Sequence, residues 1–238
     1  MTMTPTRYRY IFDVDGTLTP SRSKMNPEFA EWFASFAADR DVYLVTGSDR
    51  VKTLEQIPES VYNQCVTVYQ CNGNDVWSGS DHIKTNEMYL DERLKKDLQK
   101  CLDESLFPFA LGDHFDYRPG LVNFSIMGRP STPQERHAYV MWDDAHKERF
   151  RICEEMSKKY SKYNIQVAGE TGIDITLAGM GKEQIIHDFS PHDSLVFYGD
   201  KIVPGGNDYD LAVEIIQSGG SVWPVRSWEE TWELLREL

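Results

Sequence analysis

Two acidic side chains lie close together near the start of this 238-residue chain, at the end of an apolar segment. The segment 7–13 is rich in β-forming residues and ends in Asp13-Val14-Asp15, which precedes Gly-Thr-Leu-Thr. Because side chains alternate along a strand, the carboxylates of Asp13 and Asp15 would point to the same side. Two neighbouring carboxylates repel each other, which is energetically unfavourable unless a functional site uses the pair. We therefore interpret the pair as part of a site, with a turn of two solvated aspartates as the alternative.

A second acidic motif follows another apolar segment, near the other end of the chain. Tyr198-Gly199-Asp200-Lys201 comes directly after it, and Gly205-Gly206-Asn207-Asp208 comes a few residues later. A hard cation such as Mg²⁺ prefers carboxylate, carbonyl and water oxygens in an octahedral set. Judged alone, the motif is also compatible with an acidic loop that carries a flexible glycine pair. The expected protein ligands are Asp13, the backbone carbonyl of Asp15, Asp200, and either Asp208 or Asn207, directly or through water.

Two further features would suit a phosphate group. Thr46-Gly47-Ser48 stands between a strand-like segment and a helix that begins near Asp49, where hydroxyl and backbone N–H groups can bind phosphoryl oxygens. Lys182 carries an ammonium that would neutralise an attacking carboxylate and a phosphoryl group together. Each feature is weak alone, because Gly and Ser are common in turns and at helix starts for conformational reasons.

Alternating segments at both ends of the chain are expected to position these residues. Apolar runs predict strands at 7–13, 41–46, 66–70, 194–198 and 221–223. Helical patterns predict helices at 27–38, 49–57 and 209–217, and a last helix that opens with the capping box Ser227-Trp-Glu-Glu230. Asn72-Gly73-Asn74-Asp75 is typical of a turn.

The middle of the chain has a different pattern. A helix at 91–105 is followed by a predicted hairpin, whose strands at 115–118 and 121–127 flank Pro119-Gly120. Thr132-Pro133-Gln134-Glu135 predicts a capping box and opens one long charged helix toward Tyr160. Two more strands are expected, at 164–168 and 173–177.

These elements predict an α/β protein with two parts. Residues 1–82 and 187–238 would form a core with a parallel sheet, and residues 83–186 would form an inserted α+β domain with an antiparallel sheet. Ligands of open parallel sheets bind beyond the carboxyl ends of the strands. Asp13, Thr46-Gly47-Ser48 and Asp200 all fall at such ends, so the site is expected between the two parts.

The charge of the chain restricts its partners. A formal net charge of −13 argues against binding to nucleic acid or to anionic membranes, which needs a basic face. A phosphorylated substrate would then need local cations or a metal ion. The start of the chain lacks the apolar core of a secretory signal, which predicts a cytoplasmic location. The four cysteines are expected to be free thiols because they form no CxxC pair: Cys65, Cys71, Cys101 and Cys153.

The order of these motifs, DxDGT, a Ser after a second strand, a lysine and then GD...ND, resembles that of the haloacid dehalogenase superfamily. The resemblance implies a Rossmann-like core, and it implies that Asp13 attacks phosphorus to form an aspartyl phosphate. It further implies that Asp15 is the general acid and base, that Ser48 and Lys182 assist at the phosphoryl group, and that Mg²⁺ offsets the charge.

A narrower resemblance covers nearly the whole chain. Several segments are similar to the eukaryotic-type phosphomannomutases: the runs 12–22, 115–129, 134–136 and 197–208, and the pair Asn72-Gly73. The family implies a cap of the C2 type, interconversion of mannose 6-phosphate and mannose 1-phosphate, hexose 1,6-bisphosphate as intermediate and activator, and a homodimer through the cap. Carried over by position, the distal phosphate would be bound by Arg118, Arg129 and Arg136 with help from Arg22, and Asn123 and Asp174 would contact the sugar or the phosphate side of the cap.

The chain also departs from that family. Gly172 stands where a serine that helps hold phosphate is expected, Leu177 replaces a proline, and Thr46 stands at a usual glycine. The loss of one hydroxyl donor would weaken binding of the distal phosphate by about 1 kcal/mol. Two other functions therefore stay open. One is a sugar-phosphate phosphatase on the same scaffold, in which water accepts the phosphoryl group, and the other is a catalytically silent protein that binds sugar phosphates.

Overall fold

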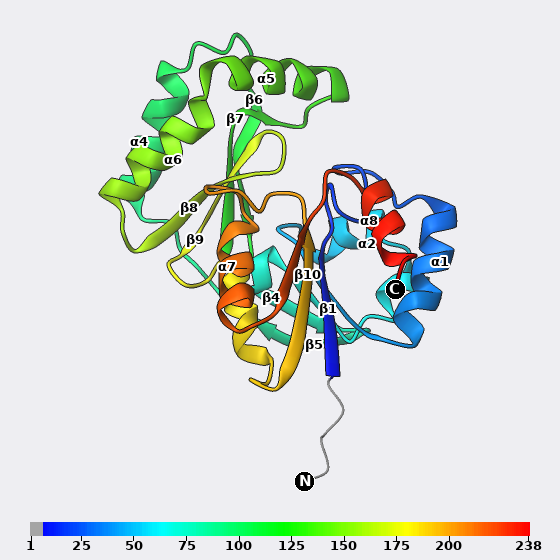
Figure 1. Ribbon diagram of the computed structural model, residues 1–238. Coiled ribbons are helices and arrows are strands. Elements are labelled where there is room, and N and C mark those ends of the chain that lie inside the picture. The colour runs from blue at the N-terminus through cyan, green and yellow to red at the C-terminus, as the bar shows by residue number, and fades with distance from the viewer. Residues whose placement is uncertain (1–6) are drawn as a thin grey trace.

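The larger of two β-sheets is built from both ends of the chain, as the computed structural model of residues 7–238 shows (Figure 1). Its order is β11-β10-β1-β2-β3-β4-β5. The first five of these strands run parallel, and β4 and β5 are antiparallel. The strands are β1 (Arg7–Asp13), β2 (Asp41–Val45), β3 (Thr67–Gln70), β4 (Asp75–Ser78), β5 (Asp81–Thr85), β10 (Asp193–Gly199) and β11 (Ser221–Pro224).

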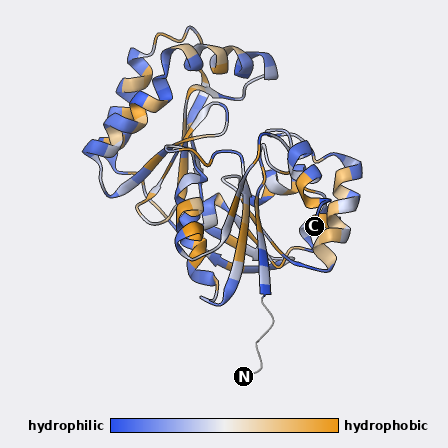
Figure 2. Ribbon diagram, in the orientation of Figure 1, coloured by the Kyte–Doolittle hydropathy of each residue, from blue (hydrophilic) through white to orange (hydrophobic). Residues whose placement is uncertain are grey.

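Helices cover both faces of this sheet, which explains why the adjacent residues Ile11 and Phe12 of β1 are both buried. Ile11 packs in one apolar cluster with Leu211 of α7, and Phe12 packs in the opposite cluster with Phe29 and Phe33 of α1. Figure 2 shows the apolar residues concentrated on these inner faces. The helices of this part are α1 (Pro27–Ala38), α2 (Arg50–Gln56), α3 (Glu59–Tyr62), α7 (Tyr209–Gln217) and α8 (Trp228–Leu235).

The second sheet is antiparallel and has the order β6-β7-β9-β8. Along β7, Val122, Phe124 and Ile126 enter an apolar cluster with the cap helices. Asn123 alternates with them and therefore lies on the other face, toward the larger sheet. The elements are β6 (Leu111–Arg118), β7 (Leu121–Arg129), β8 (Tyr163–Ala168), β9 (Gly172–Leu177), α4 (Glu92–Glu104), α5 (Pro133–His146) and α6 (Glu148–Lys159). The predicted fold class, a parallel α/β core with an antiparallel α+β cap, is confirmed.

The single long helix expected from residue 133 to Tyr160 is wrong. The helix is interrupted at Lys147, which has a left-handed backbone with φ 54° and ψ 36°. The cause is a buried ion pair around the break: Asp143 accepts a hydrogen bond from the Arg149 backbone N–H at 3.0 Å and contacts Arg149 Nε at 2.8 Å. The carboxylate thus binds the first turn of α6, and the two helices form a corner. The capping box predicted at Thr132 and Glu135 is confirmed.

The second predicted capping box, at Ser227, is also wrong. The Ser227 side chain makes no capping hydrogen bond. Glu230 instead accepts hydrogen bonds from the backbone and the guanidinium of Arg226. Because an arginine precedes the cap, the glutamate has a charged partner that competes with the backbone N–H of the serine.

The change from one sheet to the other differs slightly from the predicted borders at 83 and 186. Strand β5 continues to Thr85 in the larger sheet. On the way back, the 3₁₀ helix Lys182–Asp188 already contributes Ile185 to the apolar cluster of Leu211. Within residues 7–238, no helix is long and apolar enough to cross a membrane.

Candidate active site

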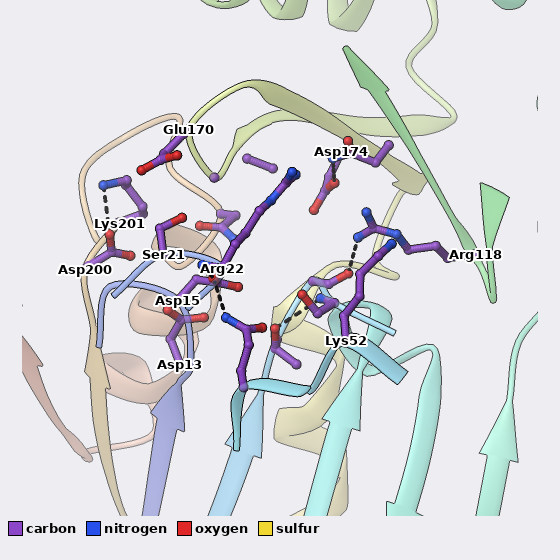
Figure 3. A pocket seen from close by; sticks show the side chains of 18 of the residues that line it. Asp13, Asp15, Ser21, Arg22, Lys52, Arg118, Glu170, Asp174, Asp200 and Lys201 are labelled. Atoms are coloured by element: carbon purple, nitrogen blue, oxygen red, sulfur yellow. Dashed lines mark hydrogen bonds and ion pairs between the residues drawn. The ribbon is translucent and has the colours of Figure 1, made fainter. Parts of the chain in front are cut away.

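A cavity of about 640 Å³ lies between the core and the cap (Figure 3). Its floor is formed by the carboxyl ends of core strands, and its opposite wall by the cap sheet. The cavity brings together most of the residues predicted from the sequence: Asp13, Asp15, Arg22, Ser48, Arg118, Asn123, Arg129, Asp174 and Asp200. Three other predicted residues lie behind this lining and contact groups near it: Lys182, Asp208 and Arg136.

Three carboxylates converge below the cavity. Asp13, Asp200 and Asp208 each offer an oxygen, and these oxygens all lie within 4.8 Å of one another. Gly16 makes room for this approach, since a Cβ there would lie 2.5 Å from Asp200 Oδ2, and its φ of +87° also favours glycine. An all-oxygen donor set of this kind fits a hard divalent cation.

The charges around this cluster do not balance. Burial raises the pKa of Asp13 well above its ordinary value, Lys182 opposes the rise, and Asp208 and Asp200 add to it. The pKa of Asp200 is also raised, first by burial and then by Asp208, although Lys201 opposes this. The carboxylates are therefore short of positive charge, which is the condition that a bound cation relieves.

Lys182 is the buried cation of the cluster. Its Nζ lies 2.6 Å from Asp13 Oδ1 and 2.6 Å from Asp208 Oδ1, and the side chain is 1% exposed. Burial alone would lower the pKa of Lys182, but Asp13 and Asp208 raise it above its ordinary value. The ammonium is therefore held charged, and it fixes one oxygen of Asp13. The other oxygen, Oδ2, accepts a hydrogen bond of 3.3 Å from the Thr17 hydroxyl.

Asp15 is oriented by groups that the sequence analysis missed. Its Oδ1 accepts hydrogen bonds from the Arg22 backbone N–H at 2.6 Å and from Gln56 Nε2 at 2.9 Å. Gln56 is the last residue of α2, and its buried amide is the available signal, because a buried glutamine needs a partner. The carboxyl group of Asp15 thus keeps one orientation at the cavity wall.

The turn after β2 connects the floor to the cap. The Ser48 backbone N–H donates to Thr46 Oγ1 at 3.1 Å, which fixes the turn that lines the cavity. Arg118, from the cap, donates through Nη1 to the carbonyl oxygen of Gly47 at 2.6 Å. Arg118 also contacts Asp116 Oδ2 through Nη2 at 2.7 Å. Its guanidinium therefore joins the two walls of the cavity.

The arginines at the cavity repel one another. The pKa of Arg22 is lowered to about 10, first by burial and then by Arg136, Arg129 and Arg118. The pKa of Arg129 is lowered too, chiefly by burial. Arg129 Nη1 and Arg136 Nε are buried, and neither has a hydrogen-bond partner among residues 7–238. Clustered guanidinium groups with unused donors fit a polyanionic group such as phosphate.

Two ion pairs at the cavity were not foreseen. Lys52 Nζ lies 3.0 Å from Asp116 Oδ2, which adds another link between the core and the cap. Glu170, at the tip between β8 and β9, contacts the guanidinium of Arg136. Partners so far apart in the sequence leave no local signal, although Asp116 and Arg118 have the spacing of one strand face.

Known proteins resemble this chain in sequence and in fold. Residues 29–238 match the family described as eukaryotic phosphomannomutase. The chain is 30% identical over 221 residues to a phosphomannomutase of Galdieria sulphuraria, covering 89% of this chain and 88% of that protein. Among solved structures, the C-terminal domain of the C. albicans trehalose-6-phosphate phosphatase has a TM-score of 0.64 at 14% identity, covering 97% of this chain and 91% of that one.

A haloacid dehalogenase-like hydrolase from Bacteroides thetaiotaomicron has a TM-score of 0.59 at 12% identity, covering 97% of this chain and 99% of that one. At such identities the two structures show a shared fold. Family membership is instead shown by the family match, which covers most of the chain. This chain belongs to the eukaryotic phosphomannomutase family.

Proposed function

We propose that this protein interconverts mannose 6-phosphate and mannose 1-phosphate, through an aspartyl phosphate on Asp13 and a hexose 1,6-bisphosphate. The observation that carries the proposal is a single cavity with a carboxylate cluster on one wall and arginines on the other. A mutase must hold two phosphate groups at once, one at the nucleophile and one at a distance from it. A phosphatase needs the first of these sites alone.

In the proposed reaction, an oxygen of Asp13 forms a bond to phosphorus, and the bond from phosphorus to the sugar oxygen breaks. Asp15 gives its proton to the leaving sugar oxygen. In the other half of the cycle, the free hydroxyl of a hexose monophosphate gives its proton to Asp15 and attacks the aspartyl phosphate, so that the bond from phosphorus to Asp13 breaks and a hexose 1,6-bisphosphate forms. The bisphosphate then turns and presents its other phosphate to Asp13. Support comes from the hydrogen bonds that orient Asp15 and from the contact of Lys182 with Asp13.

The carboxylate cluster is proposed to hold Mg²⁺ through Asp13, Asp200, Asp208 and the backbone carbonyl of Asp15. The ion would supply positive charge at the phosphoryl oxygens. Lys182 and Ser48 are proposed to assist there, Lys182 by holding Asp13 and Ser48 at the turn that lines the cavity. The raised pKa of Asp13 and Asp200 supports the need for such a cation.

The cap is proposed to hold the distal phosphate and the sugar. Arg129 of the cap and Arg22, which assists from the core, carry the guanidinium groups with the least compensation. Arg118 is already bound to Asp116 and Gly47, and Arg136 contacts Glu170. Asn123 and Asp174 would border the sugar from the same wall.

The division into a core (1–82 and 187–238) and a cap (83–186) is part of this proposal, and so is a homodimer formed through the cap. The exposed apolar side chains Leu106, Phe109 and Met141 on the cap support such an interface. The activating bisphosphate and the cytoplasmic location stay predictions.

A sugar-phosphate phosphatase is the second candidate. It is favoured by the pairing of Arg136 with Glu170, which reduces the free positive charge at the distal phosphate site. The two candidates are separated by incubating the protein with Mg²⁺, mannose 1-phosphate and a trace of glucose 1,6-bisphosphate, and following the phosphorus NMR spectrum. Mannose 6-phosphate supports the mutase, and free phosphate supports the phosphatase. No turnover of any of a panel of sugar phosphates would contradict both and favour a silent binding protein.

A further inference from the structure

A network of buried hydrogen bonds connects a core loop to an arginine of the cap. Asn72 Nδ2 donates to Asp174 Oδ2 at 3.2 Å, and Asn123 Nδ2 donates to Asp174 Oδ1 at 2.5 Å. Arg129 in turn donates from Nη2 to Asn123 Oδ1. Asn72, Asp174 and Asn123 are each at most 5% exposed. The first of these contacts joins the core to the cap, and the others lie within the cap.

At the core end of this network, the backbone of Asn72 is held by hydrogen bonds. Asn72 has a left-handed backbone, with φ 59° and ψ 33°, which asparagine tolerates better than most residues. Its backbone N–H donates to the Thr46 carbonyl at 2.9 Å, and its own carbonyl accepts from Gln184 Nε2 at 2.8 Å. The backbone of Asn72 is therefore fixed by Thr46 and by Gln184 of the 3₁₀ helix Lys182–Asp188.

The cap end reaches the core through a gap beside Gly47. Asn123 and Asp174 are directly opposed in the ladder between β7 and β9, so they move together with the cap sheet. A Cβ on Gly47 would lie 3.0 Å from Asp174 Oδ2 and 3.4 Å from Asn72 Oδ1. The absence of a side chain at Gly47 thus admits the carboxylate of Asp174 to its contact with Asn72.

We propose that Asn72 is a positioning residue, which fixes the orientation of Arg129 when the cap lies closed on the core. With the cap closed, Asn72 satisfies one oxygen of Asp174, and the second oxygen then holds the Asn123 amide so that its carbonyl faces Arg129. This arrangement leaves Arg129 Nη1 buried and free to donate. The role of that donor toward a distal phosphate rests on the proposed function, whereas the link between Asn72 and closure does not.

The test substitutes Asn72→Asp, which keeps the shape and the tolerance for a left-handed backbone but turns the donor into a second carboxylate facing Asp174. Like charges at this distance should open the cap. We expect a larger radius of gyration in small-angle X-ray scattering, and a loss on the order of tenfold or more in kcat/KM for mannose 1-phosphate. Hydrolysis of p-nitrophenyl phosphate, which is too small to need the cap, should be unchanged. Asn63→Asp, at an exposed asparagine of the core, is the matched control for the added charge.

A second variant separates positioning from a loss of folding. Combining Asn72→Asp with Asp174→Asn exchanges the two groups, so that the new amide at position 174 donates to the new carboxylate at position 72 and still accepts from Asn123. The double variant should recover closure and part of the lost kcat/KM. If the two substitutions acted independently, their losses would add and no recovery would be seen. Unchanged scattering in Asn72→Asp, or a double variant no more closed than Asn72→Asp alone, would overturn the proposal. Should the wild-type protein fail to isomerise mannose 1-phosphate, the proposed function fails, while the scattering still decides the role of Asn72.

Discussion

Lys182 and Asp13 lie in contact in the interior, with Nζ 2.6 Å from Oδ1, although 169 residues separate them in the chain. The same ammonium contacts Asp208, so one buried cation joins Asp13, the last residue of β1, to the residue that precedes α7. The nucleophile proposed for the reaction is therefore also a member of a structural ion cluster.

Removing this cation should destabilise the fold. Lys182→Met would leave Asp13 and Asp208 buried without a counterion, which typically costs about 3 to 5 kcal/mol in the free energy of unfolding. Urea denaturation without added metal measures the loss. Lys201→Met is the control, because Lys201 is half-exposed and pairs with Asp200 near the surface. Equal losses in the two variants would contradict a special role for the buried contact.

Mg²⁺ should stabilise the protein, because the carboxylate cluster proposed to bind it exists in the folded protein and not in the unfolded chain. At a concentration about 100 times Kd the gain would be about 2.7 kcal/mol, and it should appear as a higher Tm that EDTA reverses. Burial raises the pKa of Asp200, so protons compete with the ion and the gain should shrink as the pH falls. Asp200→Asn should abolish most of the gain, and a full gain in that variant would exclude the cluster as the binding site.

The contact between Asp116 and its cations should make stability depend on pH in acid. Burial opposes the charge of Asp116, but Arg118 and Lys52 prevail and lower its pKa to about 2. Because the folded pKa lies below the unfolded one, the contribution is complete above about pH 4 and disappears as the pH falls toward 2. Its size is on the order of 1 to 2 kcal/mol. Denaturation curves of the wild type and Asp116→Asn should differ at neutral pH and converge at about pH 2, and a constant difference would refute this account.

Glu170 should weaken binding of the distal phosphate, because its carboxylate occupies the guanidinium of Arg136. Glu170→Gln is expected to lower the KM for mannose 1-phosphate by up to about fivefold, the range set by a partly exposed ion pair. Glu154→Gln removes a carboxylate from another exposed ion pair, with Lys158, and should leave KM unchanged. A higher KM in Glu170→Gln would mean that the pair helps to orient Arg136 instead.

Restoring a side chain at position 172 should not restore a phosphate contact. A Cβ on Gly172 would lie 2.6 Å from Asn123 Nδ2, so Gly172→Ser must displace Asn123. We expect a loss of about 1 to 3 kcal/mol in stability, the usual effect of overpacking, together with a lower kcat/KM. Gly172→Ala should behave in the same way if the Cβ is the cause. A gain in kcat/KM for the serine variant would show that the hydroxyl is accommodated.

Local patterns were sufficient to predict much of the fold. The apolar end of β1 and the capping box at Thr132 act within a few residues, so these elements are visible in the sequence. Strand β5 was missed because all its residues are exposed and carry no apolar alternation. The corner at Lys147 was missed because its cause, the ion pair of Asp143 with Arg149, needs the helices already folded.

The candidate site likewise contains some residues whose position could be predicted from local patterns and others whose position could not. The convergence of Asp13 and Asp200 follows from the rule that the carboxyl ends of parallel strands meet at one edge. The burial of Lys182 between two carboxylates has no local signature, because both Asp13 and Asp208 lie far from it in the sequence. The pairing of Glu170 with Arg136 joins a hairpin tip to a helix, which no spacing in the sequence indicates.

The hairpin of β6 and β7 carries Arg118, Asn123 and Arg129 on one continuous stretch of chain, joined by the turn at Pro119-Gly120. Three of the residues proposed to bind the substrate thus lie on one short contiguous segment, while the carboxylates proposed to react or to hold the metal are scattered over both ends of the sequence. A graft of this segment between relatives could exchange sugar preference without touching the phosphoryl chemistry. Selection can act on the two traits separately, which makes the cap hairpin the place where new specificities would arise first.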